Sequence, residues 1–248
     1  MRDALGWRFK FGVVTPSVNT CIQPEFDAMR PPGVTNHIAR MFIPDAKIEH
    51  DAGFHAVIRS IDDALEPALE SVMTAEPDHL IMGVSIEAIW GGKEGARKVA
   101  ERIAKYSSVA ATTASDAIPA ALQALNVQGR VALICPYRQP GVEQVIKFLA
   151  EIGYEVVRAR GLPHERPSML GHFTKAQLVK ELQDIDGDDV QGIVQFGANL
   201  AMATVAGEAE RWLHKPVIAV NTALYWHALR RNGINDIVEG FGSLLERH

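Results

Sequence analysis

The sequence has few cysteines and none of the usual patterns for metals or nucleotides. Its two cysteines, Cys21 and Cys135, stand far apart with no CxxC or Cys/His spacing, which argues against a disulfide framework and a zinc site. The nine histidines are scattered and include no HExxH motif, and neither GxGxxG nor GxxxxGKS/T occurs. We therefore expect two free thiols, no bound metal and a reaction that needs no cofactor.

Long apolar segments and an excess of positive charge are also missing. No apolar run approaches the roughly 18 residues that cross a bilayer, and the first residues lack the apolar stretch of a signal peptide. The 25 basic and 30 acidic side chains give a formal net charge of -5 and form no blocks, so no nucleic-acid-binding face is expected. These absences predict a cytoplasmic protein without membrane or nucleic-acid partners.

What is present is the pattern of an α/β protein. Short apolar runs alternate with longer segments of helical period, as in repeated βα units around a parallel sheet. Helices are predicted over Asp51–Ala75 and Glu143–Ile152, the second with Gly153 as its C-cap. The predicted strands are Phe11–Val14, His37–Phe42, His79–Met82, Val109–Ala111, Arg130–Ile134, Glu155–Ala159, Gly192–Gln195 and Val217–Val220.

The two halves of the chain repeat one another. FGVVTPSVNT, HLIMGVSIEA and VAATTASDAIPAALQAL are followed, about 110 to 120 residues later, by VALICPYRQPG, GIVQFGANLA and VIAVNTALYWHALRRNG. Similar turn and helix residues recur in any α/β protein, which is the alternative explanation. We predict an α/β fold of two pseudo-symmetric lobes, each a mainly parallel four-stranded sheet flanked by helices: a first lobe 1–115, a second lobe 116–225, and a C-terminal segment 226–248 that packs back on the first.

Uncharged hydrogen-bond donors follow the predicted strands. Six strand-end loops are expected to face one cleft between the lobes. Small polar residues and exposed N–H groups at helix N-termini suit a carboxylate or a developing enediolate. Such residues are also ordinary caps and turn formers, so their recurrence at equivalent strand ends is what favours an anion site. The predicted binding residues are Asn19, Ser17, Gly83, Val84, Gly197, Ala198, Asn199 and Asn221, with Ser85 and Tyr137 as donors.

Four stretches of the sequence resemble a known family. VVTPSVNTCIQPEF, MGVSIEAIWGG, TTASDAIPAALQALNVQGRVALICPY and AERWLHKPVIAVNTALYWHALR are similar to segments of maleate cis-trans isomerases and arylmalonate decarboxylases, within the aspartate/glutamate racemase superfamily. The resemblance runs over nearly the whole chain. It implies the two-lobed fold, cofactor-independent chemistry on a small carboxylate, and a homodimer.

The resemblance also implies catalytic cysteines that this chain does not have. Racemases and maleate isomerases use one cysteine from each lobe, and arylmalonate decarboxylases keep only the second-lobe cysteine, as the proton donor; by the resemblance these positions fall on Gly83 and Gly197. Without a thiol, maleate isomerisation by thiolate addition and two-base racemisation are disfavoured. Decarboxylation needs less, because an apolar pocket favours loss of CO2 while donors hold the remaining carboxylate as an enediolate.

Two other residues are candidates for the missing proton carrier. Glu87 stands two residues after Ser85 and would have a raised pKa if buried; otherwise it is a solvated residue or a helix N-terminal charge. Cys135 precedes Tyr137 by two residues, so its thiol would face the cleft or pack as a small hydrophobe. We predict a lyase or isomerase in which Ser85 and Tyr137 donate to the oxyanion, Asn19 binds a carboxylate, and Glu87 or Cys135 moves the proton. The alternatives are a hydrolase in which Glu87 activates water, and a non-catalytic carboxylate-binding protein.

Overall fold

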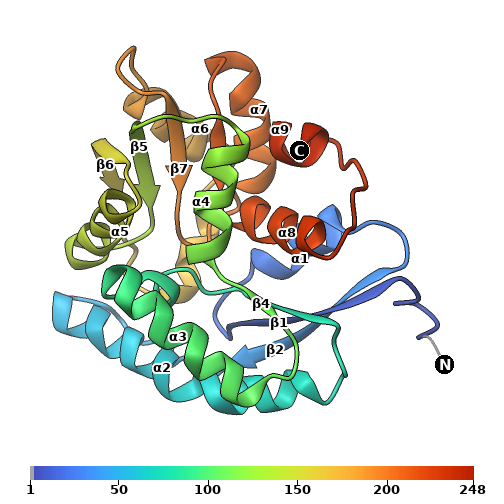
Figure 1. The fold of residues 1–248 in the computed structure, drawn as a ribbon. Helices are drawn as coiled ribbons and strands as arrows, with labels where there is room; N and C mark the ends of the chain where they lie inside the picture. Colours follow the sequence, from blue (N-terminus) through green and yellow to red (C-terminus); the bar gives the residue numbers. More distant parts are fainter. Residues whose placement is uncertain (1–2) are drawn as a thin grey trace.

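The computed structural model describes residues 3–248 and contains two four-stranded parallel sheets with the same strand order (Figure 1). The first sheet has the order β2-β1-β3-β4, and the second has the order β6-β5-β7-β8. The repeated topology confirms the predicted α/β fold of two pseudo-symmetric lobes. The strands are β1 (Phe9–Pro16), β2 (Val34–Met41), β3 (His79–Met82), β4 (Ala111–Thr112), β5 (Arg130–Cys135), β6 (Glu155–Gly161), β7 (Gly192–Gln195) and β8 (Val217–Ala219).

Helices cover both faces of each sheet. In the first lobe α2 and α3 lie on one side and α1 and α8 on the other, as Figure 1 shows. Among the described residues, none of the helices has the length and apolar character needed to cross a bilayer. The helices are α1 (Ile22–Met29), α2 (Asp51–Met73), α3 (Gly92–Tyr106), α4 (Ala114–Ala124), α5 (Gln139–Glu151), α6 (Lys175–Ile185), α7 (Ala203–Leu213), α8 (Val220–Arg231) and α9 (Ser243–Arg247), with short 3₁₀ helices η1 (Glu87–Ile89) and η2 (Pro167–His172).

The predicted strands overlap the observed ones but differ at their ends, most of all at Val109–Ala111, of which only Ala111 belongs to β4. Val220, predicted to end the last strand, instead begins α8, and Phe42 follows β2. Gly153 comes one residue after the C-cap of α5 and has a φ of 93°. This left-handed conformation is what the predicted helix-ending glycine requires.

The two lobes share one large hydrophobic core. Side chains alternate between the faces of a strand, so Val131, Leu133 and Cys135 of β5 point into the core that contains residues of both lobes. Ala132 and Ile134 point the other way, into a smaller core beneath α6 and α7. The direction of Cys135 is therefore set by its position in the strand.

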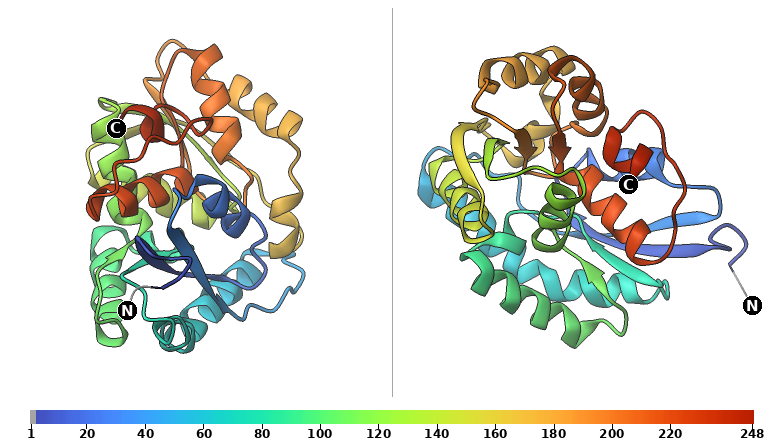
Figure 2. Two further views of the ribbon diagram at one scale, coloured as in Figure 1. Left: turned by 90° about the vertical axis from the view of Figure 1, so that its right-hand side faces the viewer. Right: turned by 45° about the horizontal axis from the view of Figure 1, so that its top comes forward.

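The chain returns to the first lobe in α8. This helix contacts α1, α4, β3 and β4, and both views of Figure 2 show the red C-terminal helices beside the blue N-terminal segment. The Tyr225 ring lies 5.5 Å from the Phe11 ring and 4.8 Å from the Phe26 ring. The predicted segment boundaries at 115/116 and 225/226 fall inside α4 and α8, and the division of the chain there stays a prediction.

Candidate active site

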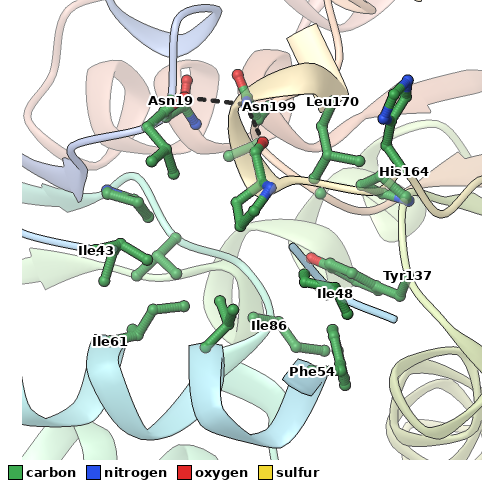
Figure 3. Close-up of a pocket in the computed structure, with 18 of the residues that line it drawn as sticks. Asn19, Ile43, Ile48, Phe54, Ile61, Ile86, Tyr137, His164, Leu170 and Asn199 are labelled. Carbon is green, nitrogen blue, oxygen red and sulfur yellow. Dashed lines mark hydrogen bonds between the residues drawn. The ribbon is translucent and has the colours of Figure 1, made fainter. Parts of the chain in front are cut away.

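A cavity lies between the lobes at the carboxyl ends of β1, β3, β5 and β7 (Figure 3). It contains about 780 Å³ of empty space, its opening to solvent included. Parallel α/β sheets bind ligands at such positions, where connections leave neighbouring strands on opposite sides. The strand-end residues that line it are Val18, Asn19, Val84, Ser85, Ile86, Pro136, Tyr137, Arg138, Gly197, Ala198 and Asn199.

Two of the six predicted loops do not reach this cavity. The loops after β4 and β8 follow edge strands and lead directly into α4 and α8, two helices that pack against each other. Thr113 is used there to cap α4, its N–H and hydroxyl both donating to Asp116. The expectation that all six loops face one cleft is therefore wrong for the edge strands.

One wall of the cavity is apolar. Four residues of α2, at i, i+3, i+4 and i+7, present one face of the helix to it: Phe54, Val57, Ile58 and Ile61. Ile43, Ile48 and Ile86 extend this surface, whereas Leu170 lies across the cavity from α2, as Figure 3 shows. No aspartate or glutamate is among the cavity-lining residues of the described chain, whereas Arg138, His164 and Arg166 are. The charge at the cavity favours an anionic ligand.

Ser85 and Tyr137 join the two lobes at the cavity. Their hydroxyl oxygens lie 3.0 Å apart, and the Gly197 N–H donates to the Ser85 Oγ at 3.0 Å. The shared bond uses one of the two hydroxyl hydrogens, so the other is free for a ligand. Burial raises the pKa of Tyr137 well above its ordinary value, and the phenol therefore stays protonated as a donor near neutral pH.

The loop after β7 has its carbonyl groups held by buried side-chain amides. Gln195 Nε2 donates to the carbonyl oxygens of Phe196 at 2.5 Å and Gly197 at 2.8 Å. Asn221 Nδ2 donates to the Ala198 carbonyl at 3.0 Å. The peptides are trans, so each N–H points away from the carbonyl that precedes it.

This arrangement directs backbone N–H groups toward the cavity. The Gly197 N–H, opposite the held Phe196 carbonyl, already meets Ser85 on that side. The Ala198 N–H shares a trans peptide with the Gly197 carbonyl, which Gln195 holds, and therefore points to the same side as the Gly197 N–H. The Asn199 N–H likewise points away from the Ala198 carbonyl, which Asn221 holds. Neither of these two N–H groups donates to another residue within 3–248. We call the N–H groups of Gly197 to Asn199 the nest, because successive backbone N–H groups of this kind can bind an anion.

The facing loop of the first lobe offers further donors. Val84, Ser85 and Ile86 all line the cavity, and within the described residues their backbone N–H groups have no hydrogen-bond acceptor. Two loops with free backbone donors, one from each lobe, therefore meet at Ser85 and Tyr137. A carboxylate or an enediolate can accept from several of them at once.

Of the three predicted asparagines, Asn19 and Asn199 line the cavity, and they differ in which polar atoms remain free for a ligand. Asn19 Oδ1 accepts the N–H groups of Cys21 and Ile22 at 2.9 and 3.0 Å, while its Nδ2 makes no hydrogen bond to the part of the chain described. Asn199 uses its whole side chain: Nδ2 donates to the Val18 and Pro167 carbonyls, and Oδ1 accepts the Thr20 N–H at 2.9 Å. Asn19 can thus bind a ligand through its side chain, and Asn199 through its backbone.

Three predicted binding residues lie behind the cavity. The Ser17 hydroxyl accepts the Ile43 N–H at 2.9 Å, and the Gly83 N–H donates to the Val14 carbonyl at 2.7 Å. Asn221 is not a lining residue; besides holding Ala198, it donates to Glu25 Oε2 at 2.6 Å. These three residues hold the donor loops in place and do not themselves reach the cavity.

Neither predicted proton carrier lines the cavity. Cys135 is fully buried in the shared core, and burial raises the pKa of its thiol to about 12. The thiol does not face the cleft as predicted, because strand alternation turns it into the core. Glu87 is 5% exposed, and neither carboxylate oxygen has a hydrogen-bond partner among the described residues. Burial, followed by the charge of Asp62, raises the Glu87 pKa to about 7.

The two glycines on which the resemblance places the family's cysteines are tightly enclosed. Gly197 has a φ of 98°, and a Cβ there would lie 2.1 Å from Cδ of Pro136. A Cβ on Gly83 would lie 2.6 Å from Cδ1 of Ile22. The remaining thiol, Cys21, is also outside the cavity lining, and burial raises its pKa to about 11. The described cavity therefore presents no thiol.

Comparison with known proteins identifies the family. A family model described as arylmalonate decarboxylase matches residues 12–245. The chain belongs to this family. The maleate isomerase of Nocardia farcinica is 26% identical over 248 residues, with 96% of each chain covered. That of Pseudomonas putida is 25% identical, with 96% of this chain and 97% of the relative covered.

Solved structures confirm the two-lobed fold. A mutant maleate cis-trans isomerase of Nocardia farcinica with a covalently bound succinylcysteine intermediate has a TM-score of 0.86 at 22% identity, covering 97% of this chain and 99% of that one. A crystal structure of arylmalonate decarboxylase has a TM-score of 0.73 at 22% identity, with 95% and 98% covered. Members of the arylmalonate decarboxylase family and their maleate isomerase relatives are cofactor-independent enzymes, which confirms the predicted class.

Several cavity residues were not predicted from the sequence. The spacing of Phe54, Ile58 and Ile61 indicated an amphipathic helix, but not that its apolar face lines a site. Arg138 directly follows Tyr137 in the sequence, and this neighbour is the one feature from which its place at the cavity could have been predicted. His164 and Arg166 lie on an irregular segment between β6 and η2 with no periodic pattern.

Proposed function

We propose that the protein is a cofactor-independent decarboxylase of a small malonate-type carboxylate that bears an apolar substituent. The observation that carries the proposal is a cavity in which uncharged donors face an apolar wall and no thiol is present among the described lining residues. Donors without a nucleophile suit a reaction that stabilises negative charge without forming a covalent bond to the enzyme.

In the proposed step the bond between the α carbon and one carboxylate breaks. CO2 departs, and the bonding electron pair delocalises onto the retained carboxylate as an enediolate. The N–H groups of Ala198 and Asn199, a hydroxyl of the Ser85–Tyr137 pair and Nδ2 of Asn19 donate to its oxygens. Phe54, Ile58 and neighbouring apolar residues strip water from the departing carboxylate, which favours neutral CO2.

The α carbon then needs a proton. Tyr137 carries one at the cavity, and a phenol, even with a raised pKa, is a far stronger acid than the C–H bond that it forms. In this proposal Tyr137 protonates the α carbon and recovers its proton from solvent. Glu87, with a pKa of about 7 behind the Ser85 loop, is the alternative proton source. The proposed roles of Ser85, Asn19 and the backbone donors are the same in either case.

Proton NMR in D2O tests the proposal. Metal-free protein is incubated with phenylmalonate, alkylmalonates, maleate, aspartate and a maleamate-type amide. We expect loss of CO2 and one deuterium at the α carbon with a malonate, and no isomerisation of maleate. Tyr137→Phe should abolish most turnover while ligand-induced thermal stabilisation persists. Glu87→Gln is the matched comparison, and loss of turnover there instead would assign the proton to Glu87.

Other outcomes would point to the alternative functions. Hydrolysis of the amide would favour the hydrolase, although Glu87 does not line the cavity that such a base would have to reach. Carboxylate-dependent stabilisation with no turnover of any compound would favour a binding protein and contradict the proposed reaction. A homodimer and a cytoplasmic location stay predictions.

A further inference from the structure

We propose that Arg138 forms a second anion-binding subsite, so that the substrate's apolar substituent ends in a carboxylate. The inference rests on the proposed function and adds the substrate class: a malonate-type head, an apolar middle and an anionic tail. The head would occupy the donors around Ser85 and Ala198, and the tail would reach the guanidinium.

Arg138 is a cavity residue with unused donors. Its Nη2 donates to the Ile48 carbonyl at 2.7 Å, whereas its Nε is buried without any acceptor. Within residues 3–248 no carboxylate forms an ion pair with it. A partly buried guanidinium that lacks an anion is costly, and a carboxylate is the group whose geometry matches its paired N–H donors.

The surrounding charges do not neutralise Arg138. The cavity lining adds His164 and Arg166 on the same side of the site and no acid within the described chain. Asp45 contacts the segment that carries His164 and Arg166, but its carboxylate already has partners there. It accepts the Ser168 hydroxyl at 2.7 Å and lies 3.8 Å from the Arg166 guanidinium. Within the described cavity lining, an anion at Arg138 would therefore meet two guanidinium groups and no carboxylate.

The Arg138 subsite lies at the end of the cavity opposite Asn19. Figure 3 shows Asn19 and Ile48 at different ends of the cavity, with Tyr137 beside Ile48 and apolar side chains such as Ile86 and Ile61 along the wall. The hydrogen bond to Ile48 places the Arg138 guanidinium at that end. A carboxylate bound at Asn19 therefore leaves the Arg138 guanidinium unpaired, so the subsite calls for a second anion at the Ile48 end.

Two series of matched compounds test the subsite. The first compares kcat/KM for n-alkylmalonates with that for ω-carboxyalkylmalonates of equal chain length. The second compares thermal stabilisation by unreactive linear dicarboxylates and by monocarboxylates of equal length, and it needs no turnover. At one chain length we expect the terminal carboxylate to raise kcat/KM and affinity at least about tenfold.

Variants then assign the effect to Arg138. Arg138→Met should bring the ratio of kcat/KM for ω-carboxyalkylmalonates to kcat/KM for n-alkylmalonates close to one. Arg138→Lys should retain part of the preference for the charged tail. Arg130→Met is the control: it removes the same charge from an exposed position at the start of β5, the strand that precedes the Arg138 loop, where Arg130 is paired with Glu155 and Asp189. It should leave the ratio unchanged. If Arg138→Met does not fold, the lysine variant and the wild-type length series still decide.

The two proposals fail in distinguishable ways. Equal rates and equal stabilisation by charged and neutral tails at every length would overturn the Arg138 subsite. So would a tail preference that persists in Arg138→Met. If no malonate is decarboxylated, the proposed function is wrong, while the dicarboxylate binding series still supports or refutes the subsite.

Discussion

The loops after β3 and β7 occupy equivalent places in the two lobes, yet they are held very differently. In the second lobe, buried amides of Gln195 and Asn221 hold three consecutive carbonyl groups, and Asn199 ties the loop to the first lobe. In the first lobe, the Gly83 carbonyl accepts a single side-chain bond, from Thr15 at 3.1 Å. The second loop is a preorganised nest of N–H groups, while the first contributes a hydroxyl and joins the apolar wall.

This contrast indicates a division of roles within one repeated fold. Fixed dipoles stabilise developing charge without reorganising during the reaction, which suits the loop of Gly197 to Asn199. The opposite loop adjoins the α2 surface that would meet a variable substituent. Duplicated topology therefore need not mean duplicated chemistry.

The largest expected effect is the difference in stability loss between alanine substitutions at Gly197 and at Gly83. Gly197→Ala combines a φ of 98° with a Cβ 2.1 Å from the Pro136 ring, so we expect a loss of about 3 kcal/mol or more in unfolding free energy. Gly83→Ala meets the movable tip of Ile22 at 2.6 Å and should lose about 1 kcal/mol. Urea denaturation of both variants measures the difference; equal losses would show that the two loops are equally constrained.

The next effect concerns the orientation of the nest. Gln195→Ala frees the Phe196 and Gly197 carbonyls, so their peptides can turn and the Ala198 N–H loses its direction. We expect kcat to fall about 100-fold with little change in KM, as when an oxyanion donor is removed. Gln195→Glu, which lacks the donating amide, should fall similarly. A normal kcat in folded Gln195→Ala would mean that the carbonyl contacts do not matter for turnover.

Two buried carboxyl groups, one near each loop, should make the stability of the fold depend on pH. Glu87 has no hydrogen-bond partner, whereas Glu25 accepts from Asn221 and the Ala203 N–H; burial is the main cause that raises the pKa of each to about 7. The folded state then keeps these protons where the unfolded chain has lost them, so stability falls as pH rises from about 4.5 to 7.

Glu87→Gln should abolish the part of this pH dependence that comes from Glu87 and leave the part that comes from Glu25. The slope of unfolding free energy against pH would then change by up to about 1.4 kcal/mol per pH unit between pH 5 and 7. Denaturation at several pH values measures it, with Asp62→Asn as a comparison that removes the neighbouring charge, together with its ion pair to Arg102, but keeps the Glu87 carboxyl. An unchanged slope would show that the Glu87 pKa is not raised.

The smallest effect is expected at the first-lobe hydroxyl. Ser85→Ala removes one donor and the acceptor of the Gly197 N–H, but the Tyr137 phenol and the backbone donors remain. We expect about a tenfold loss in kcat, compared with the larger loss in Gln195→Ala. If Ser85→Ala costs more than Gln195→Ala, the first lobe, and not the second, provides the main charge stabilisation.

Much of the site followed from the order of strands and loops in the sequence. Asn19, Ser85, Tyr137 and the Gly197 loop were predicted because residues at the ends of parallel strands meet at one edge of a sheet. The edge-strand loops were misjudged because strand order is not visible in the pattern of apolar runs. Cys135 was misjudged because a shift of one residue along a strand reverses the face.

The sequence by itself determined the strands, the repeat and the lack of thiols at two glycine positions, since apolar period and turn residues act locally. Only the tertiary structure decided which loops share the cavity, that α2 supplies its wall, that Gln195 and Asn221 hold the nest, and that Arg138 lacks an acidic partner. Those features depend on how two lobes pack on a common core. They rest on side-chain contacts that span from one position, between Gln195 and Phe196, to 112 positions, between Ser85 and Gly197, and such contacts leave no periodic trace in a single chain.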